Sequence, residues 1–189
     1  MTLILASTSA IRRQMLDSAG VAYEAVRPLV DEAELKRGMT DPFEVARQLA
    51  EAKALSIGGE WVIGSDSVVT VDGRLFDKPR DREDAAAHLR FFSGKPMRLV
   101  SAVAIAREGK IDWSHVEQAE LEVRPLSEAF IAAYLEAEWP EVGYTVGVFR
   151  LEGRGVQLFS SISGDHFTIL GMPLLPLLGA LRERELLAA

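Results

Sequence analysis

The sequence predicts an α/β protein with a mixed, twisted sheet and flanking helices. Short apolar runs typical of buried strands alternate along the chain with segments of helical spacing. One long pair of strand-like segments, 99–106 and 111–123, surrounds Glu108-Gly109-Lys110 and indicates an antiparallel hairpin. Strands joined by helices, together with this hairpin, make a mixed sheet.

The amino-terminal half supplies the first strands and helices. Ser9 is a suitable N-cap for a helix that stops at Gly20, and Pro42 suits the first turn of a second helix. Residues 27–40 are polar and acidic, which predicts a loop, and Asp72-Gly73 predicts a tight turn. The predicted elements of this half are strands 3–6, 21–26, 61–63 and 68–71 and helices 10–19 and 42–57.

The carboxy-terminal half continues the alternation. Asp81 and Ser127 are placed to cap two further helices, the second of which ends at Trp139-Pro140. Residues 143–155 are rich in glycine and predict irregular structure, and 156–162 predicts a strand. The apolar segment 169–178 predicts a strand end that leads into a last helix starting at Pro173.

Composition limits the functional classes. The 189 residues suit a single domain spanning 1–189, and two lobes around a cleft remain an open alternative. A net charge of −7 argues against nucleic acid or an anionic membrane surface as partner. No apolar stretch reaches the roughly 18 residues of a membrane span. The absence of cysteine and of a signal peptide fits a cytoplasmic protein.

The first thirteen residues predict an anion site. An apolar strand runs into the hydroxyls of Ser7 and Ser9 and then into a helix that begins with Arg12 and Arg13. Hydroxyls, first-turn N–H groups and the positive end of the helix dipole all favour a phosphate there. The arginines add forked, permanently charged donors.

Asp66 and Lys53 are the next candidates for chemistry. The strand 61–63 is expected to stop at Gly64, which would leave Asp66 where a buried strand surfaces. A carboxylate there can bind a divalent metal or accept a proton from attacking water, and the structural alternative is a turn cap. Lys53 lies on an apolar helix face, where a lysine either reaches out to solvent or points its charge into a cleft.

Glu32 and Lys78 are further candidates for chemistry. The acidic run containing Glu32 is either a solvated surface or part of a metal site opposite phosphate. Lys78, restricted by Pro79, is either an ordinary surface lysine or a cation that neutralises a leaving phosphate. The sequence lacks a P-loop, a GxGxxG loop and a GxSxG motif, and its three histidines have no ligand spacing.

Taken together, these segments resemble the Maf family of nucleotide pyrophosphatases over nearly the whole chain. Six fragments occur in the family's order. They are Leu5-Ala6-Ser7-Thr8-Ser9-x-x-Arg12-Arg13, Val30-Asp31-Glu32, Ala52-Lys53-Ala54, Gly64-Ser65-Asp66-Ser67-Val68-Val69, Lys78-Pro79 and Gly171-Met172-Pro173-Leu174.

The resemblance implies a fold related to inosine triphosphatases, with a central cleft. It implies hydrolysis of a nucleoside triphosphate to the monophosphate and pyrophosphate, with Mg²⁺ or Mn²⁺, in a house-cleaning role. Asp66 would be the proton acceptor and, with Glu32, a metal ligand. Lys53 and Lys78 would join the catalytic set. The phosphate- and base-binding set would be Ser7, Ser9, Ile11, Arg12, Arg13, Ser67 and Glu152. Family members often form homodimers.

Two residues bear on the branch of the family. Ile11 and Glu152 resemble the branch that acts on 7-methyl-GTP, although Ile11 lacks a ring that could stack on a base. A carboxylate at Glu152 can accept hydrogen bonds from a guanine-type edge. Ser67 matches neither branch pattern. The alternatives are a pyrophosphatase for thymidine and uridine triphosphates, a phosphosugar hydrolase, and a non-catalytic nucleotide-binding regulator of cell division.

Overall fold

The computed structural model describes residues 2–188, which separate into two compact units. The first unit comprises the residues up to 67, residues 100–117 and the residues from 165 onward. The second comprises residues 68–99 and 118–164. Three strands, β3 (Trp61–Val71), β5 (Pro96–Arg107) and β6 (Lys110–Val123), contribute residues to both units.

The described residues form a mixed α/β fold with a seven-stranded sheet, as the sequence predicts. The four other strands are β1 (Leu3–Ala6), β2 (Glu24–Val26), β4 (Arg74–Phe76) and β7 (Phe159–Ser163). The α-helices are α1 (Ala10–Ser18), α2 (Glu32–Lys36), α3 (Pro42–Leu55), α4 (Arg82–Phe92), α5 (Glu128–Glu138), α6 (His166–Leu170) and α7 (Leu174–Glu183).

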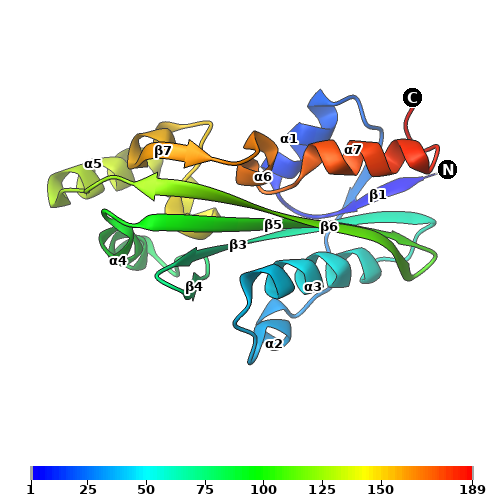
Figure 1. The fold of residues 1–189 in the computed structure, drawn as a ribbon, viewed down its shortest axis with the longest axis horizontal. Coiled ribbons are helices and arrows are strands. Elements are labelled where there is room, and N and C mark those ends of the chain that lie inside the picture. The colour runs from blue at the N-terminus through cyan, green and yellow to red at the C-terminus, as the bar shows by residue number, and fades with distance from the viewer. Residues whose placement is uncertain (1, 189) are drawn as a thin grey trace. The chain divides into compact units, whose positions relative to one another are not determined.

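In the first unit, three parallel strands lie in the order β2, β1, β3. The register pairs Leu3 with Trp61 and Ala6 with Gly64, so β1 ends where β3 continues for seven more residues. Figure 1 shows α1 and α7 on one face of this part of the sheet and α2 and α3 on the other. Apolar side chains on both faces of a strand are expected when helices cover both sides.

The core of the first unit explains why polar and apolar residues do not alternate along its strands. Leu5 and Ile63 are completely buried in the sheet, and Leu16 and Leu181 are completely buried on the covering helices. Burying each such side chain contributes roughly 1.5–3 kcal/mol. The apolar runs that predict strands in the sequence are therefore the inner layer of this unit.

Gly64 permits a close approach of α3 to β3. A Cβ atom at residue 64 would lie 2.1 Å from the Ala50 carbonyl oxygen and 2.4 Å from the Ala54 nitrogen. Only glycine fits this contact, since real Cβ atoms do not approach backbone so closely. The close approach brings Lys53 on α3 against Asp66 on β3, where the two side chains form an ion pair.

The second unit contains the Asp72-Gly73 hairpin, α4, α5 and the short strand β7. Asp72 and Gly73 both have positive φ, at 51° and 73°, and they join β3 to β4 as predicted. In α5, Tyr134 is buried and its hydroxyl donates to the carbonyl of Val148. Three 3₁₀ helices, Glu141–Tyr144, Val146–Val148 and Arg154–Leu158, occupy most of the glycine-rich segment.

Four segments differ from the sequence prediction. The predicted loop 27–40 contains α2, which Asp31 caps by accepting from the Glu34 N–H. The predicted strand 21–26 is only Glu24–Val26, and the first half of 156–162 is a 3₁₀ helix. The predicted strand end at 169 is instead α6, whose cap is Asp165. The five-residue helices α2 and α6 are too short to show a helical periodicity in the sequence, which is why the sequence analysis did not predict them.

The structure also corrects the course of β3. The sequence predicts that the strand stops at Gly64, but β3 runs unbroken from Trp61 to Val71. Glycine and polar residues suggest a turn, but here Gly64 serves helix packing, and the Ser65 hydroxyl is satisfied by the Ala102 carbonyl at 2.8 Å. Asp66 is thus held on a strand and not on a loop. Within residues 2–188, no helix has both the length and the apolarity needed to cross a membrane.

Candidate active site

Ser7 and Ser9 shape the turn between β1 and α1 in the first unit. The Ser7 hydroxyl accepts from the backbone N–H of Ser9 at 3.1 Å. Ser9 caps α1 by accepting from the Arg12 N–H at 3.5 Å, as predicted from the sequence. The positive end of α1 therefore starts directly after β1, which is the arrangement that favours an anion.

Arg12 is buried at the start of α1 and turns inward. Its Nε donates to the Gly171 carbonyl oxygen at 2.9 Å, and its Nη2 donates to the Ser67 hydroxyl at 3.1 Å. The Asp66 carboxylate lies 3.9 Å from Nη2. Burial lowers the pKa of the Arg12 guanidinium, while the nearby charges of Asp66 and Glu32 act in the opposite direction. The guanidinium is thus a buried cation with mostly neutral partners.

Lys53 joins two carboxylates from different elements. Its Nζ lies 2.8 Å from Glu32 Oε1 on α2 and 3.2 Å from Asp66 Oδ1 on β3. The Lys53 side chain is only 8 % exposed, so it does not reach out to solvent. Its charge is directed inward, which is the functional alternative that the sequence left open.

Asp66 lies where β1 no longer covers β3. Because β1 ends opposite Gly64, Asp66 lies two residues beyond the last pair between β1 and β3. Its partners are Lys53 and Arg12, from α3 and α1. Asp66, Lys53 and Arg12 therefore form one cluster, as the sequence predicts.

Two carboxylates of the cluster are candidate ligands for a hard divalent cation. Glu32 Oε1 and Asp66 Oδ1 lie 2.8 and 3.2 Å from the same Lys53 ammonium, so the two carboxylates lie close to each other. Among the described residues, no group of three or more His, Cys, Asp or Glu side chains is arranged to hold a metal. Two carboxylates completed by substrate oxygens are the usual protein contribution to a Mg²⁺ site.

Two other predicted residues lie on α1. Arg13 is exposed, and its Nη2 donates to the Thr8 carbonyl at 3.0 Å. Ile11 is half-buried on the same helix. On a helix, residues 12 and 13 point in directions about 100° apart. Of the two adjacent arginines, the structure therefore brings only Arg12 to Asp66.

Two other predicted residues belong to the second unit. Lys78 is exposed in the segment between β4 and α4. Glu152 is exposed, with its Oε1 4.0 Å from Nε of Arg150. Arg150 also lies 3.6 Å from Glu141. The roles assigned to Lys78 and Glu152 stay predictions, as does the central cleft.

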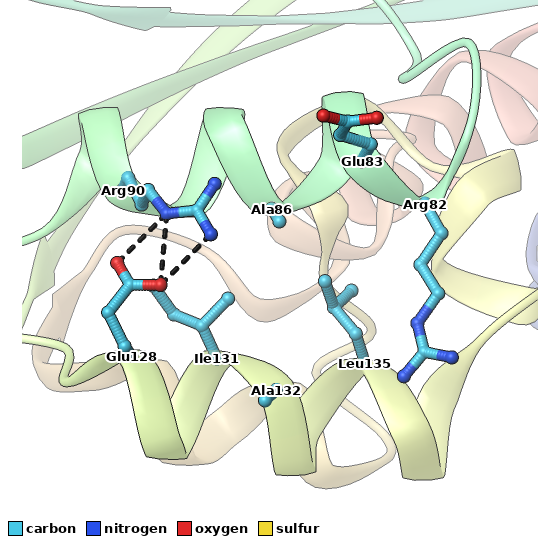
Figure 2. Close-up of a pocket in the computed structure, with 8 residues that line it drawn as sticks. All are labelled: Arg82, Glu83, Ala86, Arg90, Glu128, Ile131, Ala132 and Leu135. Atoms are coloured by element: carbon cyan, nitrogen blue, oxygen red, sulfur yellow. Dashed lines mark hydrogen bonds and ion pairs between the residues drawn. The ribbon is translucent and has the colours of Figure 1, made fainter.

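A groove between α4 and α5 of the second unit contains none of the predicted site residues (Figure 2). Figure 2 shows Ile131 and Leu135 projecting from α5 toward α4, with Arg90 paired to Glu128 at one end. This exposed pair is bidentate, with Nε and Nη2 2.8 and 2.9 Å from the carboxylate oxygens. Both arginines that line the groove are paired, Arg90 with Glu128 and Arg82 with Glu136.

The sequence analysis missed two contributors to the cluster, Ser101 and the Gly171 carbonyl. Ser101 is completely buried, and its hydroxyl lies 2.9 Å from that of Ser67. A serine inside the otherwise apolar run 99–106 was the available signal. Gly171 appears in the sequence analysis only as part of a motif, and its carbonyl oxygen gave no sequence signal.

Comparison with known proteins identifies the family. The sequence model described as Maf-like protein matches residues 2–184. The chain belongs to the Maf family. It is similar to a 7-methyl-GTP pyrophosphatase of Rhizobium etli, at 47 % identity over 96 % of this chain and 95 % of the other.

Other relatives carry a broader name. A nucleoside triphosphate pyrophosphatase of Nitrobacter hamburgensis is 46 % identical over 98 % of this chain and 95 % of its own. Among solved structures, a dITP/XTP pyrophosphatase of Mycobacterium abscessus overlaps 65 % of this chain and 73 % of its own, with 19 % identity and a TM-score of 0.41. That structural likeness is only partial.

Proposed function

We infer that this protein is a nucleoside triphosphate pyrophosphatase, which hydrolyses its substrate to a nucleoside monophosphate and pyrophosphate. Its similarity to enzymes of that name extends over almost the entire chain. The observation that carries the inference is the buried cluster of Asp66, Lys53 and Arg12 beside the amino-terminal end of α1. Two cations and a helix start favour a polyphosphate, and the carboxylate supplies a base.

In the proposed reaction, a water oxygen attacks the α-phosphorus. The new bond is from that oxygen to phosphorus, and the bond that breaks joins the α-phosphorus to the bridging oxygen, which leaves with pyrophosphate. Asp66 accepts the proton that the water loses. Arg12 and Lys53 stabilise the charge on the phosphates, with Ser7 and the first turn of α1 donating hydrogen bonds. Positioning and charge neutralisation replace a covalent nucleophile.

Glu32 and Asp66 would hold the divalent cation, Mg²⁺ or Mn²⁺. The support is the convergence of both carboxylates on Lys53 Nζ. When bound, such a cation would neutralise phosphate charge. Lys53, which pairs with both carboxylates, would hold them close to each other for such a cation.

The proposed preferred substrate is 7-methyl-GTP or another modified nucleotide. Glu152 is the candidate acceptor for N–H groups on the base edge. The alternative substrates are thymidine and uridine triphosphates, and the alternative outside catalysis is a nucleotide-binding regulator of cell division. A homodimer and a cytoplasmic location stay predictions.

The test is pyrophosphate release from a panel of canonical and modified triphosphates, with and without Mg²⁺ or Mn²⁺. We expect pyrophosphate without free phosphate, and a loss of at least 10²-fold in Asp66→Asn while that variant still binds the nucleotide. Turnover of thymidine or uridine triphosphate but not 7-methyl-GTP would overturn the base preference alone. An Asp66→Asn variant with full activity, or orthophosphate as the only product, would overturn the reaction.

A further inference from the structure

The way Arg12 is held points to a residue that orients it. A guanidinium is planar, and Nε with Nη2 forms one of its two edges suited to paired hydrogen bonds. Both atoms of this edge donate to neutral acceptors, Nε to the Gly171 carbonyl and Nη2 to the Ser67 hydroxyl. The other edge, Nη1 with the second hydrogen of Nη2, therefore faces away from these two acceptors.

Ser67 is itself fixed by its neighbours. Its hydroxyl lies 2.9 Å from the Ser101 hydroxyl and 3.0 Å from the Gly171 carbonyl. Ser101 is completely buried and donates to the Thr168 carbonyl at 2.7 Å. Since the Ser101 proton is used there, Ser67 donates its own proton to Ser101 or Gly171. Its lone pairs remain available to accept from Arg12.

Gly171 is shaped to make the second contact. Its φ of 108° is a conformation that side-chain-bearing residues rarely adopt. A Cβ atom there would lie 3.2 Å from the Ser67 hydroxyl and 3.7 Å from Arg12 Nη2. The backbone turn between α6 and α7 thus presents a carbonyl to Arg12 in a conformation that favours glycine, and an added Cβ atom would press on the Ser67 hydroxyl.

We propose that Ser67, supported by Ser101 and the Gly171 carbonyl, is a positioning residue that fixes the plane of the Arg12 guanidinium. The fixed plane directs the opposite edge of Arg12 to two oxygens of one substrate phosphate, which is the paired geometry that arginine forms with phosphate. Both hydrogen-bond acceptors on this edge are neutral, and the nearby Asp66 carboxylate lies 3.9 Å from Nη2, beyond hydrogen-bond distance, so it takes no hydrogen-bond donor from the phosphate. The proposal rests on the proposed function and goes beyond it, since the Ser67 hydroxyl acts through Arg12 and not on the substrate.

The test is a double-mutant cycle between Ser67→Ala and Arg12→Lys. A hydrogen bond to a charged group predicts that Ser67→Ala lowers kcat/KM about tenfold, and Ser67→Thr, which keeps the hydroxyl, recovers most of the loss. Lysine has no Nε–Nη2 edge, so Ser67→Ala in the Arg12→Lys background should change kcat/KM less than twofold. The same cycle is read from the Kd of a non-hydrolysable α,β-methylene triphosphate, which requires no turnover.

Ser65→Ala is the matched control. Ser65 lies two residues away on β3 and is completely buried, and its single hydroxyl proton goes to the nearer carbonyl, that of Ala102 at 2.8 Å, with the Gly171 carbonyl at 3.2 Å. In this variant the Gly171 carbonyl keeps its hydrogen bonds from Arg12 and Ser67. We expect Ser65→Ala to lower Tm as much as Ser67→Ala does, while its kcat/KM stays within about twofold of that of the unmodified protein. Additive losses in the cycle, no recovery in Ser67→Thr, or an equal loss in Ser65→Ala would each overturn the proposal. An unmodified protein that releases no pyrophosphate would instead overturn the proposed function.

Discussion

Replacing Gly64 by alanine should separate Lys53 from Asp66 and destabilise the first unit. The added Cβ would meet the Ala50 carbonyl at 2.1 Å, about 1.3 Å short of ordinary contact at 3.4 Å. Both nearest atoms are backbone atoms of α3, so no side-chain rotation can relieve the clash, and the helix must move as a whole. The ion pair at 3.2 Å between Lys53 and Asp66 would lengthen with it.

The magnitude follows from the size of the displacement. Overpacking of a tight core costs about 1–3 kcal/mol, and a backbone clash belongs at the upper end of that range. For a domain of this size, about 3 kcal/mol lowers Tm by roughly 6–12 °C. A misplacement of about 1 Å in a catalytic group can lower the rate by about 10²-fold. We therefore expect Gly64→Ala to lose both stability and pyrophosphate release.

Thermal unfolding followed by circular dichroism, with kcat/KM measured at 25 °C, checks this prediction. Gly58→Ala is the matched control because no atom lies within 4 Å of the position of its Cβ. It should stay within about 0.5 kcal/mol of the unmodified protein. A Gly64→Ala variant with Tm unchanged within about 2 °C and full activity would refute the packing argument.

Two further predictions concern the second unit. Tyr134→Phe should lower the free energy of unfolding, measured in urea, by about 1–3 kcal/mol, because the Val148 carbonyl loses its hydrogen-bond donor. The control Tyr144→Phe, at an exposed tyrosine, should leave the free energy of unfolding unchanged. Equal losses of unfolding free energy in the two variants would contradict this prediction. Hydrogen bonds from the Arg80 side chain and, second, from its backbone N–H lower the pKa of Asp84 from 3.8 to about 2. The stabilisation from this pair is present above about pH 4 and is lost as the pH falls toward 2. In Arg80→Ala, NMR should show the Asp84 midpoint rising part of the way to 3.8, since the backbone N–H of residue 80 remains; an unchanged midpoint would refute the assignment.

Much of the fold could be predicted because its signals are local. The caps Ser9 and Ser127 and the turn Asp72-Gly73 each act within a few residues, and the structure has all three where expected. The apolar runs of the central strands were also correctly identified. The course of β3 could not be predicted, because Gly64 is explained by a helix that packs from a distant part of the chain.

The candidate site also has features that the sequence predicts and features that depend on contacts between distant parts of the chain. Residue type and order identify Asp66, Lys53, Glu32 and Arg12, and the structure brings these four together. Periodicity could not decide which way Lys53 points, since that depends on the closeness of α3 to β3. The carbonyl of Gly171 is a backbone group that every residue type carries, so its contact with Arg12 follows only from the folded structure.

The site of water attack tests the central claim most directly. Hydrolysis of the preferred triphosphate in H₂¹⁸O, followed by mass spectrometry of the products, shows which phosphorus accepts the water oxygen. The account predicts one ¹⁸O atom in the nucleoside monophosphate and unlabelled pyrophosphate. Label in the pyrophosphate, or in released orthophosphate, would contradict it.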